Sequence, residues 1–143
     1  MQREHLRDVA ECLLRYEAVA AKLKKPRSET AAFHVSEKLR HLLSTLLGAA
    51  GFRALLARAL HLATAEVPEL RPVEIKTDGS LAGLSKVARD ARGTQLAKGE
   101  VLLITELLAL LDTFIGEALM LRLVEDVWPK ATLDALKEEQ TGE

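Results

Sequence analysis

Residues 101–124 read VLLITELLALLDTFIGEALMLRLV and form the most apolar stretch of the chain. Apolar side chains occupy nearly every face that this stretch would present as a helix, and a helix that is apolar on all sides is buried. We therefore predict one long central helix over about 95–127, ended by Trp128-Pro129. Six charged residues interrupt 101–127, whereas a membrane span needs about 18 or more apolar residues with few charges. The stretch thus predicts a core helix and no membrane contact.

Two earlier segments carry apolar residues at helical spacing, with steps of three and four. The stripe residues are Leu6, Val9, Leu13, Tyr16, Ala20 and Leu23 in the first segment, and Ala32, Val35, Leu39, Leu42, Leu46 and Ala49 in the second. Pro26 ends the first predicted helix, and Ser28 caps the second. Such a pair forms either an antiparallel hairpin within the chain or a coiled-coil seam with another chain, and both options stay open.

The run GAAG at 48–51 interrupts the second stripe, and we predict a break or kink there. The reason is that each Gly costs about 1 kcal/mol against Ala in a helix interior. A third helix is predicted from about 52 to 67, because Pro68 disfavours helical backbone at the residue before it.

Residues 68–80 are the main stretch without helical character. Positions 73–76 alternate apolar and charged residues, and Asp78-Gly79 is a turn dipeptide. A hairpin would need a second alternating run, and SLAGL at 80–84 is a poor one. We therefore predict an extended segment that leads into a short helix over 81–91, capped by Ser80. An isolated strand needs a pairing partner, and a second copy of the chain could supply it.

The composition favours helix throughout, because the apolar residues are mostly Leu and Ala while aromatic residues make up only 3%. The predicted fold is all-α: a four- to five-helix bundle around a long, nearly all-apolar central helix, with one short extended segment. Residues 1–129 are predicted to form a single helical domain, and 130–143 a short amphipathic or frayed C-terminal tail.

Charge is balanced overall but not along the chain. The net charge is −1, yet residues 1–61 carry eleven Lys or Arg against six Asp or Glu, and residues 62–143 carry nine against fifteen. This polarity could support head-to-tail association, although solvated helix faces explain it equally well. Cys12 is the single cysteine, and no apolar signal core follows Met1. Both features are expected of a cytoplasmic protein.

Two groups of polar residues were considered as sites. His34, Glu37 and His41 could share one helix face and ligate a metal, but that face lies opposite the apolar stripe, so we favour a solvated polar face. Glu106, Thr113 and Glu117 fall on one stripe of the central helix. Either the acidic stripe is exposed, or its carboxylates are buried and pair with arginines of the earlier helices. The candidate partners are Arg40, Arg53 and Arg58.

The chain contains no nucleophile elbow, phosphate-binding loop or dinucleotide fingerprint, so no catalytic residue and no cofactor is predicted. The basic residues around 22–27 lack interleaved aromatics, which makes nucleic-acid binding a weaker alternative.

The sequence favours a non-enzymatic interaction module that associates with itself or with another helical protein. The candidate interaction residues are Leu6, Leu13, Tyr16, Val73 and Ile75. A bundle that binds a metal or a small ligand is the alternative, and a DNA-binding regulator is a weaker one.

Overall fold

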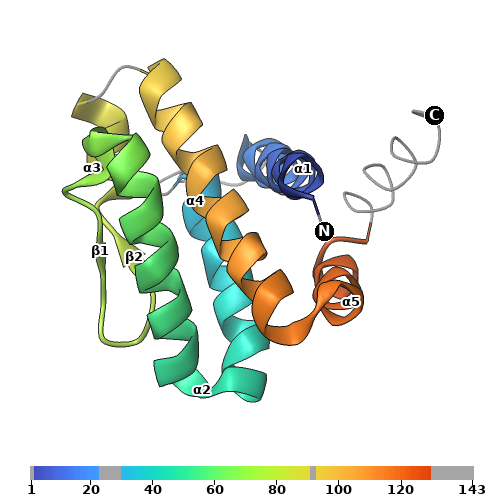
Figure 1. The fold of residues 1–143 in the computed structure, drawn as a ribbon. Coiled ribbons are helices and arrows are strands. Elements are labelled where there is room, and N and C mark those ends of the chain that lie inside the picture. The colour runs from blue at the N-terminus through green and yellow to red at the C-terminus, as the bar shows by residue number, and fades with distance from the viewer. Residues whose placement is uncertain (1, 23–29, 91–92, 130–143) are drawn as a thin grey trace.

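The computed structural model describes residues 2–22, 30–90 and 93–129, and these residues adopt the predicted all-α fold (Figure 1). The described elements are α1 (Arg3–Lys22), α2 (Ala31–Glu66), the 3-10 turn η1 (Pro68–Leu70), β1 (Glu74–Ile75), β2 (Leu81–Ala82), α3 (Leu84–Asp90), α4 (Gly93–Ile115) and α5 (Glu117–Val127). The predicted cap Ser28, most of the basic cluster around 22–27 and the tail 130–143 lie outside the described residues.

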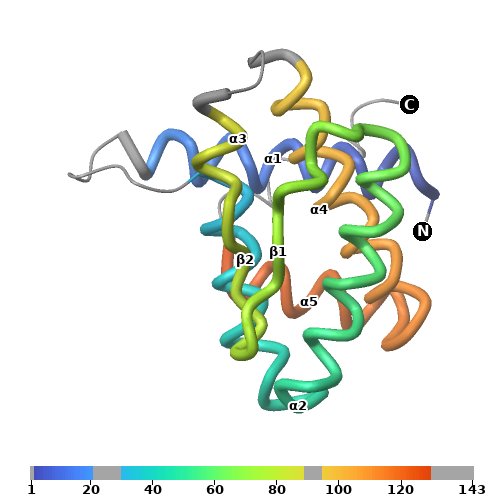
Figure 2. Tube along the Cα trace, turned by 90° about the vertical axis from the view of Figure 1, so that its left-hand side faces the viewer, coloured from blue at the N-terminus to red at the C-terminus, as the bar shows by residue number. Residues whose placement is uncertain are grey.

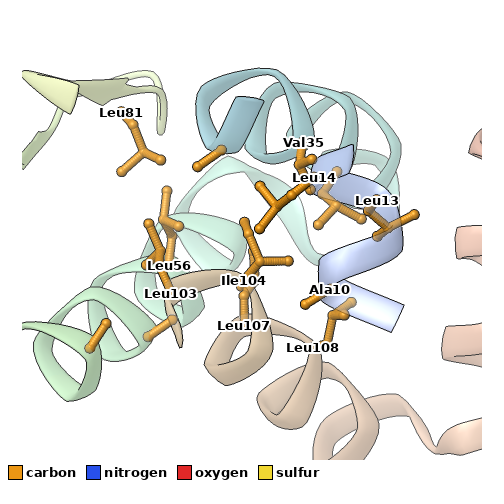
Figure 3. Packing of buried hydrophobic residues seen from close by; sticks show 14 of the residues in the cluster. Ala10, Leu13, Leu14, Val35, Leu56, Leu81, Leu103, Ile104, Leu107 and Leu108 are labelled. Carbon is orange, nitrogen blue, oxygen red and sulfur yellow. The ribbon is translucent and has the colours of Figure 1, made fainter. Parts of the chain in front are cut away.

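Helix α4 is the core helix that the sequence predicts. Six consecutive residues, 103–108, are buried, so this part of α4 is enclosed on every side. Apolar side chains of α1 and α2 surround it, as Figure 3 shows for Leu13 and Val35. One cluster of buried apolar side chains extends from Leu6 to Trp128 and includes residues of every helix.

Helix α2 is two arms joined by a corner at Gly48, which confirms the predicted break. The backbone there has φ 76° and ψ 160°, a combination that is essentially restricted to glycine. The two arms run side by side in opposite directions (Figure 1). The first arm begins at Ala31, and its cap is Thr30 and not the predicted Ser28, because the Thr30 hydroxyl accepts a hydrogen bond from the backbone N–H of Phe33 at 3.4 Å.

The corner bears on whether α2 could cross a membrane. An 18-residue window of α2 reaches a mean hydropathy of 1.3 with at most two charged residues, and only 22% of that window is buried. By length and composition alone, such a window could span a bilayer. The 18-residue window of α2 that leaves out Gly48 is 49–66, and it includes three charged residues. Every window of α2 with at most two charged residues therefore contains Gly48. The apolar stretch therefore includes the corner at Gly48 and is not one straight helix in this structure.

The prediction of one helix over 95–127 was wrong in one respect, because the chain turns sharply at Gly116. Helix α4 ends at Ile115, and α5 turns away from it (Figures 1 and 2). Gly116 has φ 89° and ψ 156°, nearly the same backbone conformation as Gly48. Both corners are possible because glycine has no Cβ to clash with the backbone at positive φ.

The predicted isolated strand was also wrong, because 73–76 pairs within its own chain. Strands β1 and β2 are antiparallel, with Glu74 opposite Ala82 and Ile75 opposite Leu81. The turn at 76–80 is closed by hydrogen bonds that the N–H and the hydroxyl of Ser80 donate to Asp78 Oδ1, at 2.9 and 2.6 Å. Ser80 therefore belongs to this turn and does not cap a helix, and α3 begins at Leu84. The turn residues are sufficient to form a hairpin, although each of its strands is only two residues long.

Helix α1 packs on its own chain. The sequence alone does not decide between this packing and packing on another chain. Its stripe residues Leu6, Val9 and Leu13 are buried against α2 and α4. In Figure 2 α1 lies across one end of the helices, with the N-terminus at the side of α4.

Candidate functional site: an exposed apolar surface at two corners

Three large apolar side chains are exposed beside the two glycine corners. Phe114 is 67% exposed, Leu46 is 55% exposed and Leu119 is 41% exposed. Leu46 precedes Gly48 by two residues, whereas Phe114 and Leu119 stand on either side of Gly116. Both corners lie at the same end of the molecule in two perpendicular views (Figures 1 and 2). We refer to Leu46, Phe114 and Leu119 as the corner surface.

The sequence placed these three residues in the core, and the corners explain why they are not. Leu46 continues the buried stripe of α2, but Leu43 is the last fully buried residue of that arm before Gly48. Phe114 lies in the last turn of α4, beyond the enclosed part of that helix. At neither Gly48 nor Gly116 would a Cβ atom meet a described atom within 4 Å, apart from the neighbouring residues of the chain and the nearby helix backbone. The corners are thus open to solvent on the described part of the chain.

The acidic stripe of the sequence is divided between two environments. Glu106 is buried and pairs with Arg3 of α1, whereas Thr113 and Glu117 are exposed beside the Gly116 corner. The predicted partners Arg40, Arg53 and Arg58 were wrong for Glu106. The actual partner lies 103 positions earlier, and only the packing of α1 on α4 brings the two together.

A buried carboxylate joins α1, α2 and the end of α5. Glu17 is 4% exposed, and its Oε2 accepts hydrogen bonds from Lys38 Nζ at 2.5 Å and from the indole Nε1 of Trp128 at 2.8 Å. Lys38 Nζ also lies 5.7 Å from the ring centroid of Tyr16 and 5.9 Å from that of Trp128, within the range of cation–π contacts. Sequence analysis missed this cluster, because Glu17 carries no local signal that separates it from a solvated acid.

The candidate metal ligands of α2 make other contacts. Arg40 binds both carboxylate oxygens of Glu37, at 2.7 and 2.8 Å. His34 meets the ring of Phe33 edge-on at 5.6 Å, and His41 is exposed. Across 2–22, 30–90 and 93–129, no three His, Cys, Asp or Glu side chains come together in a metal-binding arrangement.

A half-buried acid, Glu100, lies beside the start of α2. Glu100 of α4 accepts a hydrogen bond from the backbone N–H of Ala32 at 2.8 Å, so it stabilises the first turn of α2. Burial raises the pKa of Glu100, and its hydrogen bonds with Ala32 and Thr30 oppose that effect. One turn further along α2, the hydroxyl of Ser36 is fully buried and has no hydrogen-bond partner among the described residues.

Two grooves lie away from the corner surface. One, of about 550 Å³, runs between α1 and α4 over an apolar floor of Val101 and Leu102. Its walls carry charges of both signs: Arg3, Arg7, Lys98, Glu4, Glu11 and Glu66. The other is a shallow groove of about 480 Å³ between α2 and β1, lined by residues that include Val73 and Ile75.

The predicted interaction residues fall into three settings. Leu6 and Leu13 belong to the core and are not accessible in this structure. Val73 is buried beneath the hairpin, while Ile75 is half-buried at the shallow groove. Tyr16 remains exposed, although its ring contacts Lys38. The corner surface lies apart from all five of these residues in sequence and contains the most exposed large apolar side chain of the described chain.

Comparisons with known proteins do not assign the chain to a family. No protein-family model matches the sequence, and neither the curated proteins nor the solved structures include a significant match.

Proposed function

We propose that this protein is a homotypic interaction module, two copies of which meet through the corner surface. The observation that supports this proposal is the exposure of Phe114, Leu46 and Leu119 at one end of the bundle. Exposed apolar residues that gather on one part of the surface mark interaction sites on soluble proteins, and aromatic side chains buried in an interface contribute much of its binding energy. The chain has only five aromatic residues, and Phe114 is the one most exposed to solvent.

A second copy is the partner that suits the charge pattern of this end. In a dimer with two-fold symmetry the same surface meets itself, so a charged surface would face its own charges. Residues 42–52, which form the α2 corner, contain no charged side chain. Depletion of charge is also typical of the centre of an interface. The nearest acid on the other corner, Glu117, lies at the exposed start of α5, where it could remain at a solvated rim.

The test is the oligomeric state of matched variants over a concentration series, measured by native mass spectrometry and light scattering. We expect the wild type to dimerise and Phe114→Asp to remain monomeric. Val19→Asp is the control, because Val19 is 56% exposed and lies on α1, which crosses the end of the molecule away from the two corners (Figure 2). A loss of about 2 kcal/mol per copy at a central aromatic residue weakens a symmetric dimer several hundred-fold. A monomeric wild type at all concentrations, or equal dimerisation of Phe114→Asp and wild type, contradicts the proposal.

The groove between α1 and α4 favours a second candidate function, the binding of a small ligand. Its volume of about 550 Å³ falls in the range of ligand pockets, which is about 300–1,000 Å³. Walls with charges of both signs suit a zwitterionic molecule with an apolar body. The same native mass spectra test this candidate, since a monomer that carries added mass supports it and a bare polypeptide mass at every concentration contradicts it.

A further inference from the structure

The corner at Gly116 depends on one residue. Positive φ at position 116 is essentially restricted to glycine, and apart from the two chain neighbours no described atom lies within 4 Å of the place where a Cβ would stand. No other described part of the chain therefore packs directly against residue 116. In the bent form α5 is held by its buried side chains Met120 and Val124 and by Trp128 at its end.

The residues around this corner have the hydrogen-bond pattern of an interrupted helix. The N–H of Gly116 donates to the carbonyl of Asp112 at 2.9 Å, and the N–H of Met120 donates to the carbonyl of Gly116 at 3.0 Å. Both bonds join residues four apart, as in a continuous helix. Between them, the N–H groups of residues 117–119 open a new helix, and no side chain caps it. A straight helix through 116 would return these three groups to helical hydrogen bonds.

The docking site of α5 is built by segments that lie before the corner. Glu17 of α1 accepts the indole N–H of Trp128, and Lys38 of α2 lies over the Trp128 ring. In Figure 1 α5 lies at the edge of the molecule. The element that docks and the surface that receives it are therefore joined covalently only through α4 and the single hinge residue Gly116.

We infer that two copies of this chain exchange α5: the α4–α5 corner straightens at Gly116, and Trp128 of each copy docks onto Glu17 and Lys38 of the other. This inference rests on the proposed self-association, but the two copies then associate through exchanged α5 helices and a straightened Gly116 corner, and not through two bent corners. The receiving surface is complementary by construction, because it is the surface that α5 occupies within one chain. Exchange of an identical element is a low-cost route to a dimer for the same reason.

Exchange also gives one exposed side chain of the hinge a partner. Phe114 and Leu119 stand on either side of Gly116, and in the bent chain both face solvent. In a straight helix Leu119 lies about 60° around the axis from Gly116, whereas Phe114 lies on the opposite side. Two straight helices that cross at Gly116 can approach closely, because glycine carries no side chain, and they bury Leu119 between the copies.

Complementation between two variants tests the exchange directly. Glu17→Gln lacks the carboxylate, and Trp128→Phe lacks the indole donor while keeping an aromatic ring. The two variants are mixed in denaturant and refolded together, with only the Glu17→Gln chain labelled with ¹⁵N. Trp128 is the single tryptophan, so the labelled chain has one indole N–H resonance. We expect a wild-type-like resonance to return in the mixture, because exchange brings Trp128 of one chain to the intact Glu17 of the other.

Two substitutions at the hinge should move the dimerisation in opposite directions. Gly116→Ala disfavours the bent backbone and favours the straight helix, so we expect the association constant to rise roughly tenfold or more. Ala118→Gly, two residues away and exposed, disfavours the straight helix and should lower the association constant. These two variants keep the inference testable if Glu17→Gln does not fold.

The outcomes separate the exchange from the proposed function. A wild-type dimer without indole complementation, and with no effect of Gly116→Ala, overturns the exchange and leaves the corner-surface dimer in place. A wild type and a Gly116→Ala variant that both remain monomeric overturn the exchange and the proposed function together. Complementation with opposite effects of the two hinge variants supports both.

Discussion

The indole of Trp128 donates a 2.8 Å hydrogen bond to Glu17, a buried carboxylate 111 positions earlier in the chain. Lys38 binds the same carboxylate oxygen, so the acid has one cationic and one neutral donor. A buried carboxylate is stabilised only when it is paired and hydrogen-bonded. This arrangement therefore fastens the end of α5 to both α1 and α2.

Replacement of Glu17 by Gln should lower the free energy of unfolding by about 1.5–3 kcal/mol, since hydrogen bonds to a charged partner are lost. The measurement is urea unfolding followed by circular dichroism. Glu11→Gln is the matched control on the same helix, because Glu11 forms a partly exposed ion pair with Arg7 at 3.3 Å. That change should cost less than about 1 kcal/mol. Equal losses for the two variants would show that the burial of Glu17 does not increase what its hydrogen bonds contribute to the free energy of unfolding.

Glu100 should make the stability of the protein depend on pH at values above the ordinary pKa of a glutamate, 4.5. Its pKa is raised in the folded state from the ordinary value of 4.5, so the folded protein binds the proton more tightly than the unfolded chain does. Its contribution to stability is therefore fully present below pH 4.5 and is lost as the pH rises through the folded pKa. Glu100→Gln keeps an acceptor for the N–H of Ala32 and removes the titration.

The stability of Glu100→Gln relative to wild type should consequently rise with pH and then level off. Urea unfolding at a series of pH values from about 4 to 8 measures this difference directly, because the titrations of the other groups are shared by both proteins. A difference that stays constant with pH, or that falls as the pH rises, would contradict the assigned effect of burial on Glu100.

Ser36 should be one of the few positions where removing a polar group is harmless. Its hydroxyl is fully buried without a partner on the described chain, so it has lost hydration without gaining a hydrogen bond. Ser36→Ala should leave stability unchanged or raise it by up to about 1 kcal/mol. Thr105→Val is the contrast, because the buried Thr105 hydroxyl donates to the carbonyl of Val101 at 2.6 Å. Thermal unfolding that ranks Ser36→Ala below Thr105→Val would refute this account.

The helices and most of the core could be predicted from sequence because periodic burial is a local property. The stripe through Leu6 and Leu13 and the enclosed part of α4 are recognisable from residue spacing alone, and both are confirmed. The corner at Gly116 could not be predicted in the same way. Helix-forming residues flank it on both sides, and a single Gly costs a helix interior only about 1 kcal/mol. Whether the chain bends there depends on the docking of Trp128, which is not a local interaction.

The exposure of the candidate site could not be predicted from the sequence either, because it depends on the two corners. Leu46, Phe114 and Leu119 follow apolar patterns that predict burial, and only the two corners leave them exposed. The partner of Glu106 was assigned to the wrong helix, because the packing of α1 against α4 has no signature in either sequence segment. Spacing identifies which residues share a face, but it does not say which faces meet.

The pairing of Arg3 with Glu106 has a consequence for the order in which the chain folds. The two residues are 103 positions apart, so more than a hundred residues must be synthesised after Arg3 before this contact can form. The arms of α2 meet across a short corner and can associate as soon as they emerge, and α1 can pack on them, but the side of α1 that faces α4 stays uncovered until α4 has been made. Helix α1 thus completes its packing only after a later helix has left the ribosome.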